Sequence, residues 1–96
     1  MSYKDEYHPG VKKDLKQLER AVVKEVFESH IEKVLQHPES GERLRGELSG
    51  IFSYHFRKNK IDYRIAYTVD EARKIIYVLR IAKRENFYEV LKRRFT

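Results

Sequence analysis

Two stretches in the second half of the chain concentrate side chains that can bind a phosphate and transfer a proton. The first is IFSYHFRKNKIDYR, residues 51–64, and the second is RIAKRENFY, residues 80–88. Arginine and lysine bind phosphates, histidine titrates near neutral pH, and tyrosine can stack on a base or donate a proton. Whether these side chains meet depends on the elements that carry them.

The first stretch and the residues after it alternate between apolar and polar side chains, which predicts strands over 51–57 and 61–69. A two-residue turn at Asn59-Lys60 would pair Lys58 with Ile61. The same register would pair Arg57 with Asp62 and His55 with Arg64. Opposed side chains have Cβ atoms about 4.5–5.5 Å apart. One face of the hairpin would then hold an imidazole and two guanidiniums within reach of a single phosphate.

For this hairpin alone, an ordinary solvated strand face is the slightly better interpretation, because arginine and histidine are common there. The second stretch changes the balance. Arg84 and Tyr88 are four residues apart, which predicts that they share one side of a helix beginning at the strand end. A cation at a helix N-terminus is disfavoured by the helix dipole, so a function would account for Arg84 better than stability does.

The remaining pattern predicts the elements that position these residues. A short strand over 2–8 stops at Pro9-Gly10, and helical spacing follows over 10–19 and 21–36, as two helices or one kinked helix. The segment 74–82 is apolar on both faces and reads as a central strand, and NFYEVLKRRFT reads as a C-terminal helix. The order is β-α-α-β-β-β-α in a single α+β domain, residues 1–96. The helices are expected to cover the aromatic face of the hairpin, which carries Phe52, Tyr54, Phe56, Tyr63, Ile65 and Tyr67.

Composition narrows the class of protein. The chain has 96 residues, is 41% hydrophobic and contains no cysteine, which excludes disulfides and thiolate metal sites. No signal peptide and no apolar run long enough to cross a bilayer is visible, so we expect a cytoplasmic protein without membrane contact. The four histidines are dispersed and there is no glycine-rich phosphate loop. We therefore expect no metal and no cofactor.

The net charge of +6 is unevenly distributed. Residues 1–50 carry nine Lys and Arg against ten Asp and Glu, whereas residues 51–96 carry twelve against five, a net charge of +7. A one-sided basic surface suits a polyanion or an acidic protein, because neutralised phosphates release counterions.

Four segments together resemble the toxins of the RelE/ParE superfamily, and RelE-type members most closely: YHPGVKKDLKQL, LRGELSGIFSYHFR, DYRIAY and VLRIAKRENFY. The resemblance implies a curved antiparallel sheet, with two N-terminal helices on one face and a short C-terminal helix. It also implies a toxin that cleaves messenger RNA in the ribosomal A site, an endoribonuclease of the mRNA interferase type that inhibits translation.

The resemblance also implies residue roles. Arg64 matches a phosphate-binding arginine, Arg84 one that stabilises the transition state, and Tyr88 a tyrosine that stacks on the substrate base and helps with proton transfer. His55 and Arg57 stand where the best-known members have lysines, and His55 is our candidate for the general base that activates the 2′-OH. The further cations expected to bind the nucleic acid are Lys58, Lys60, Arg80 and Lys83.

Two alternatives remain open at this stage. One is a ParE-like toxin that inhibits DNA gyrase without cleaving nucleic acid, and the other is a catalytically silent RNA-binding relative. For the partners, we expect mRNA, the 70S ribosome and a small acidic RelB-like antitoxin, with a monomeric free toxin and an oligomeric complex. The antitoxin is expected to dock near a loosely held C-terminal helix that offers Phe87, Val90, Leu91 and Phe95.

Overall fold

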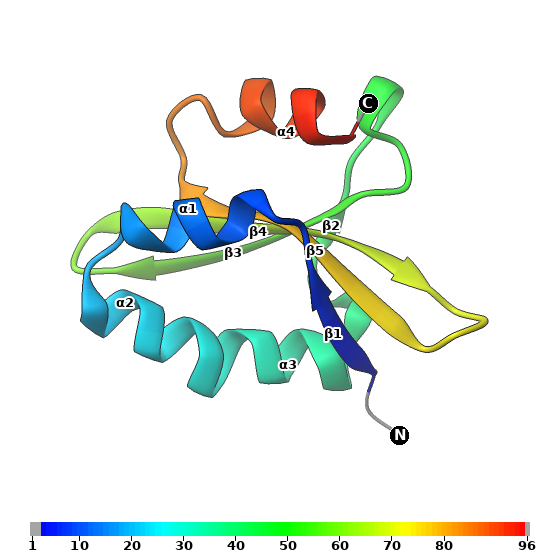
Figure 1. The fold of residues 1–96 in the computed structure, drawn as a ribbon, viewed down its shortest axis with the longest axis horizontal. Helices are drawn as coiled ribbons and strands as arrows, with labels where there is room; N and C mark the ends of the chain where they lie inside the picture. Colours follow the sequence, from blue (N-terminus) through cyan, green and yellow to red (C-terminus); the bar gives the residue numbers. More distant parts are fainter. Residues whose placement is uncertain (1–2, 96) are drawn as a thin grey trace.

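The computed structural model describes residues 3–95. In this range five strands form one sheet in the order β1-β5-β4-β3-β2 (Figure 1). The strands are β1 (Lys4–Tyr7), β2 (Glu42–Arg43), β3 (Phe52–Lys58), β4 (Ile61–Asp70) and β5 (Ile75–Lys83). All neighbours are antiparallel except β1, which runs parallel to β5. The sheet is therefore mostly antiparallel, as predicted, with one parallel pair at its edge, and β5 lies between two neighbours, also as predicted.

The helical part of the chain before the hairpin is interrupted between α1 and α2. Helix α1 (Gly10–Lys16) ends before Glu19, whose extended backbone precedes α2 (Arg20–Glu25). From α2 the chain continues through a π-helical turn, η1 (Val26–His30), into α3 (Ile31–Gln36). Two helical segments thus form, and the first is three residues shorter than predicted. The short 3₁₀ turns η2 (Pro38–Ser40) and η3 (Gly46–Leu48) flank β2.

The hairpin has the register that the sequence predicts. Lys58 opposes Ile61, Arg57 opposes Asp62 and His55 opposes Arg64. The turn residues Asn59 and Lys60 have φ values of 52° and 67°. Positive φ at both central residues is typical of the type I′ turn, whose twist matches that of a β-hairpin. Local sequence therefore predicts correctly which residues share the hairpin face with His55.

The two faces of the sheet are packed differently. On one face the aromatic side chains of β3 and β4 pack against the segment α2–η1–α3, drawn below the sheet in Figure 1. Tyr67 and Ile65 are fully buried there. On the other face, α4 (Phe87–Phe95) packs Phe87 and Leu91 against Ala66 and Leu79. Beyond α4, this second face is open.

Helix α4 is held in place, which differs from the expectation of a loosely held helix. Phe87 and Leu91 are 1% and 0% exposed, so an antitoxin can reach these two side chains only by displacing the helix, whereas Phe95 is 40% exposed. Lys92 forms an ion pair of 2.8 Å with Glu47. Arg94 forms a bidentate pair with Asp14, at 2.6 and 2.7 Å. Burial and two ion pairs together fix both sides of the helix.

Candidate active site

The open part of the second face brings an imidazole, a guanidinium and a phenol together from three elements. His55 on β3 opposes Arg64 on β4. Arg64 donates a hydrogen bond of 2.8 Å from Nη1 to the hydroxyl of Tyr88 in the first turn of α4. The Arg64 guanidinium carbon also lies 5.2 Å from the centre of the Tyr88 ring. Arg64 is the centre of this group.

Tyr88 holds the Arg64 guanidinium by a hydrogen bond and by its ring. The Nε of Arg64 is buried without a hydrogen-bond partner within residues 3–95, while Tyr88 packs edge-on against the buried ring of Phe87, at 5.4 Å between ring centres. Because the strand and the helix are both anchored, the guanidinium has little rotational freedom. A rigid guanidinium with unused donors is well suited to a phosphate, which accepts several hydrogen bonds.

The surroundings of His55 favour the neutral form of its imidazole. Partial burial lowers the pKa of its imidazole from the usual 6.5, and the charge of Arg64 lowers it further. The carboxylates of Glu42 and Asp62 oppose this shift without cancelling it. The Nε2 atom lies 3.1 Å from the hydroxyl of Ser53. At neutral pH the imidazole is therefore mainly uncharged, as a general base must be.

Arg57 completes a pocket at the tip of this face. An open pocket of about 400 Å³ is lined by His55, Phe56, Arg57, Asp62, Tyr63 and Arg64. The Nε of Arg57 lies 3.6 Å from Oδ1 of Asp62, and both side chains are exposed. Such an exposed pair contributes little to stability. Arg57 can therefore turn from Asp62 to a phosphate at small cost.

Arg84 does not lie in the helix, in contrast to the prediction. Strand β5 ends at Lys83, and residues 84–86 form a turn before α4 begins at Phe87. Asn86 has a φ of 53°, a left-handed conformation that separates the turn from the helix. The backbone N–H of Arg84 donates to Asp62 O at 3.2 Å, which holds the turn beside the hairpin, and its side chain is exposed. Arg84 and Tyr88 therefore do not share one side of a helix, although they are four residues apart.

Two of the cations predicted to bind nucleic acid lie elsewhere. Lys58 is on the helix-covered face and forms an ion pair of 2.9 Å with Glu25. Glu25 also lies 2.8 Å from Nε2 of His30 in the π-helical turn. Lys83 opposes the buried Tyr63, so it projects from the face opposite Arg64. Lys60 is exposed in the hairpin turn, next to the pocket.

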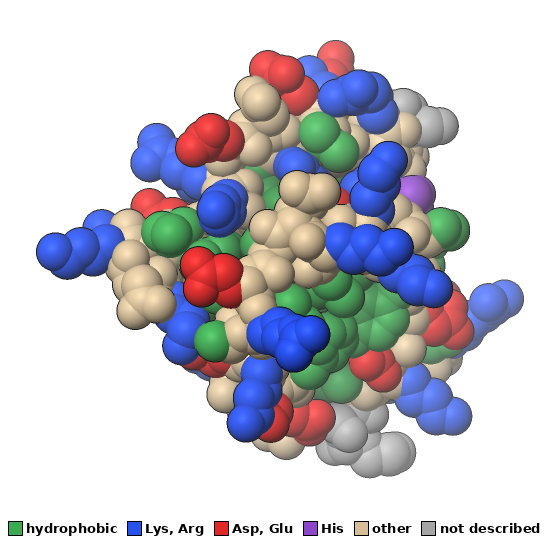
Figure 2. Space-filling model, turned by 60° about the vertical axis from the view of Figure 1, so that its left-hand side comes forward, with side chains coloured by type: hydrophobic (Ala, Val, Ile, Leu, Met, Phe, Trp, Pro, Cys, Tyr) green, Lys and Arg blue, Asp and Glu red, His purple; other side chains and the backbone are tan. Residues whose placement is uncertain are grey.

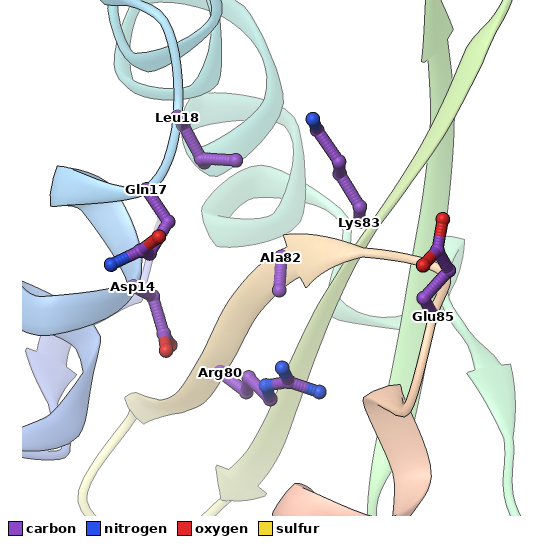
Figure 3. A pocket seen from close by; sticks show the side chains of 7 residues that line it. All are labelled: Asp14, Gln17, Leu18, Arg80, Ala82, Lys83 and Glu85. Atoms are coloured by element: carbon purple, nitrogen blue, oxygen red, sulfur yellow. The ribbon is translucent and has the colours of Figure 1, made fainter.

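Arg80 supports the turn at residues 84–86. It is half-buried on β5, its Nη1 donates to Asn86 O at 3.1 Å, and its guanidinium carbon lies 4.9 Å from the centre of the Phe87 ring. Burial lowers the pKa of this guanidinium. Figure 3 shows Arg80 in a second pocket of about 240 Å³, with Asp14, Gln17, Leu18, Ala82, Lys83 and Glu85. Arg80 thus links β5 to the start of α4.

The chain matches the family model described as the ParE-like toxin of type II bacterial toxin–antitoxin systems, over residues 6–92. The chain belongs to this family. It is therefore the toxin of a type II toxin–antitoxin system. No curated protein sequence matches the toxin significantly.

Solved structures agree with this assignment. The toxin is similar to the RelBE2 toxin–antitoxin complex of Mycobacterium tuberculosis, with 27% identity and a TM-score of 0.76, covering 88% of this chain and 100% of that one. The archaeal RelE–RelB complex of Pyrococcus horikoshii has 27% identity and a TM-score of 0.62, covering 88% and 98%. A double mutant of E. coli RelE in the free state shares the fold at 22% identity, with full coverage of both chains and a TM-score of 0.76. The RelE-like fold is thus confirmed.

Two further findings concern membrane-spanning helices and metal-binding groups of side chains. Within residues 3–95, no helix is long and apolar enough to cross a membrane. The same residues contain no group of three histidine, aspartate or glutamate side chains placed to hold a metal ion.

Proposed function

We propose that the toxin is an endoribonuclease that cleaves messenger RNA by attack of a ribose 2′-oxygen on the adjacent phosphorus. The observation that carries this proposal is the meeting of His55, Arg64 and Tyr88 on one open face. Cleavage of this kind needs a base, an acid and positive charge on the phosphorane, and these three side chains can supply them.

Each side chain has a defined part in the proposed reaction. The neutral His55 takes the proton of the 2′-OH as the new P–O bond forms. Arg64 and Arg84 stabilise the charge on the phosphorane oxygens. As the bond from phosphorus to the 5′-oxygen breaks, the leaving oxygen takes a proton from Tyr88, whose ring stacks on the adjacent base. The products carry a 2′,3′-cyclic phosphate and a 5′-hydroxyl.

We propose that Arg57, Lys60 and Arg80 strengthen RNA binding, with the ribosomal A site in the cytoplasm as the place of action. The basic second half of the chain supports a polyanionic ligand. Figure 2 shows one side of the molecule, where Lys and Arg side chains, with some Asp and Glu, lie around an apolar area. Lys58 and Lys83 are left out of the proposed RNA surface because they project from the face opposite Arg64.

The test is cleavage of an mRNA by the purified toxin, with and without ribosomes, mapped by primer extension. A 2′,3′-cyclic end and loss of cleavage when the attacking ribose is 2′-deoxy are the expected results. An end carrying a 5′-phosphate, or cleavage of the 2′-deoxy substrate, contradicts the proposed chemistry.

A second candidate function is inhibition of DNA gyrase without cleavage, which the ParE-like family match leaves open. Assays of DNA supercoiling and of mRNA cleavage separate the two candidate functions. A gyrase inhibitor blocks DNA supercoiling by purified gyrase and leaves mRNA intact.

We also propose an acidic antitoxin as partner, since relatives of known structure occur as complexes with RelB. An apolar pocket between α1 and η1 is exposed and lies beside Lys12; it is lined by Tyr7, His8, Pro9, Val11, Lys12, Leu15 and Phe27. Hydrogen exchange on the complex separates docking here from docking at α4. Protection confined to residues 7–27 would contradict docking at α4.

A further inference from the structure

The buried ion pair between Asp14 and Arg94 joins three elements that are distant in the sequence. Its side chains are only 7% and 14% exposed. Besides the two bonds to Asp14, Arg94 donates to Leu79 O at 2.9 Å and to Gly10 O at 3.3 Å. The backbone N–H of Ile81 donates to Oδ2 of Asp14 at 3.1 Å. One carboxylate and one guanidinium thus connect α1, β5 and α4.

The ion pair bonds to the edge of β5 at the point where the neighbouring strand β1 has ended. Strand β1 pairs with β5 only as far as Tyr7 and Val78, and beyond this point no strand of the described residues lies at the edge of β5. Asp14 accepts the next free edge N–H, from Ile81, and Arg94 donates to the edge carbonyl of Leu79. Gly10 leaves the necessary room, since a Cβ there would lie 2.7 Å from Cζ of Arg94. The surroundings are therefore shaped around this guanidinium.

Stability alone is a poor explanation of this pair. Two buried charges lose their hydration, and well-packed apolar side chains at such sites are often equally stabilising. What the pair adds is direction, because bidentate hydrogen bonds fix both distance and orientation. The apolar contacts of Phe87 and Leu91 hold α4 on the sheet but do not determine its rotation, since hydrophobic burial is non-directional.

We propose that Asp14 and Arg94 are positioning residues, which set the rotation and axial place of α4 so that Tyr88 meets Arg64. Arg94 is six residues after Tyr88 on the same helix, about 9 Å along its axis. A rotation or shift of α4 at the ion pair therefore also moves the phenol of Tyr88. The activity readout rests on the proposed ribonuclease function, whereas the geometric readout does not.

The experiment compares Asp14→Asn and Arg94→Lys with a control, Val34→Ala, which creates a cavity in the core on the opposite face. NMR cross-peaks between the Tyr88 ring and the Arg64 side chain report the geometry. Cleavage rates are measured below the unfolding temperature of every variant. A displacement of about 1 Å can lower a rate on the order of 10²-fold. We expect both ion-pair variants to lose the cross-peaks and to lower kcat about this much at little change in KM, while the control keeps both.

Wild-type cross-peaks and wild-type kcat in a folded ion-pair variant would overturn the proposal. Arg94→Lys keeps the charge but cannot bind both carboxylate oxygens, so it decides the matter if Asp14→Asn does not fold. If the wild-type toxin cleaves no RNA, the ribonuclease proposal fails by itself. In that case the cross-peaks alone decide: their loss in the ion-pair variants supports the positioning role, and their retention refutes it.

Discussion

The two faces of the sheet are built from the same strands but serve different purposes. Ile65 on β4 is fully buried under the helices, whereas its neighbour Arg64 points to the open face and contacts Tyr88. The helix-covered face is aromatic and closed, and its polar groups, such as His30 and Glu25, bond to each other. The open face carries Arg64 and Arg80, whose Nε atoms are buried and have no hydrogen-bond partner within residues 3–95. One face therefore provides stability, whereas the other tolerates buried polar atoms without partners beside the cations that we propose to bind RNA.

The largest expected effect tests the closed face. Ile65→Ala should lower the free energy of unfolding by about 2–5 kcal/mol, because it leaves a cavity in a fully packed core. Urea denaturation measures the change, and Arg57→Ala is the control on the open face, expected within about 0.5 kcal/mol of wild type. Equal losses for the two variants would remove the distinction between the faces.

Arg84→Ala tests the open face, where we expect a loss of activity and not of stability. It should lower the cleavage rate about 10²–10³-fold, like the loss of an oxyanion-hole donor, and leave stability nearly unchanged, because the side chain is exposed. Single-turnover cleavage is the measurement. Arg73→Ala is the matched control, since Arg73 is an exposed arginine in the turn between β4 and β5. Wild-type cleavage by Arg84→Ala would refute the assigned role.

The pH profile tests His55. Because burial and Arg64 lower its pKa, the base is uncharged above a midpoint that lies below 6.5. Cleavage should therefore rise with pH through this midpoint and level off near neutral pH. His55→Gln should lose roughly 10²-fold in rate and also the acidic limb of the profile. His37→Gln, at an exposed histidine, should keep that limb. An unchanged profile for His55→Gln would assign the base elsewhere.

The smallest effect separates two neighbouring cations on opposite faces. RNA affinity should fall with salt, and Arg57→Ala should reduce the log–log slope by about 0.7, the value for one phosphate contact on a single strand. Lys58→Ala should leave the slope unchanged, because Lys58 pairs with Glu25 on the other face. Fluorescence anisotropy with a 2′-deoxy oligonucleotide measures both. Equal slopes for the two variants would contradict the assignment of faces.

Local sequence accounts for much of the fold and for half of the site. The alternation of 51–57 and 61–69, with a turn at Asn59-Lys60, predicts the facing pairs correctly, because the side-chain period of a strand is two and a short turn sets the register. The same reasoning fails at residues 84–88, where Asn86 interrupts the helix that the spacing predicts. The same period of two puts Lys58 on the face of Phe56, so the sequence itself contradicts the assignment of Lys58 to the nucleic-acid surface.

The sequence by itself determined the aromatic and the cationic face of the hairpin, the basic second half, and the order of the elements except the two-residue strand β2, which it did not predict. Only the tertiary structure decided the parallel pairing of β1 with β5, the meeting of Arg64 with Tyr88 and the ion pair of Asp14 with Arg94. The physical reason is the range of the interactions. Periodicity and turn chemistry act between residues a few positions apart, whereas Asp14 and Arg94 are 80 positions apart and meet only when β1 ends and leaves the edge of β5 open.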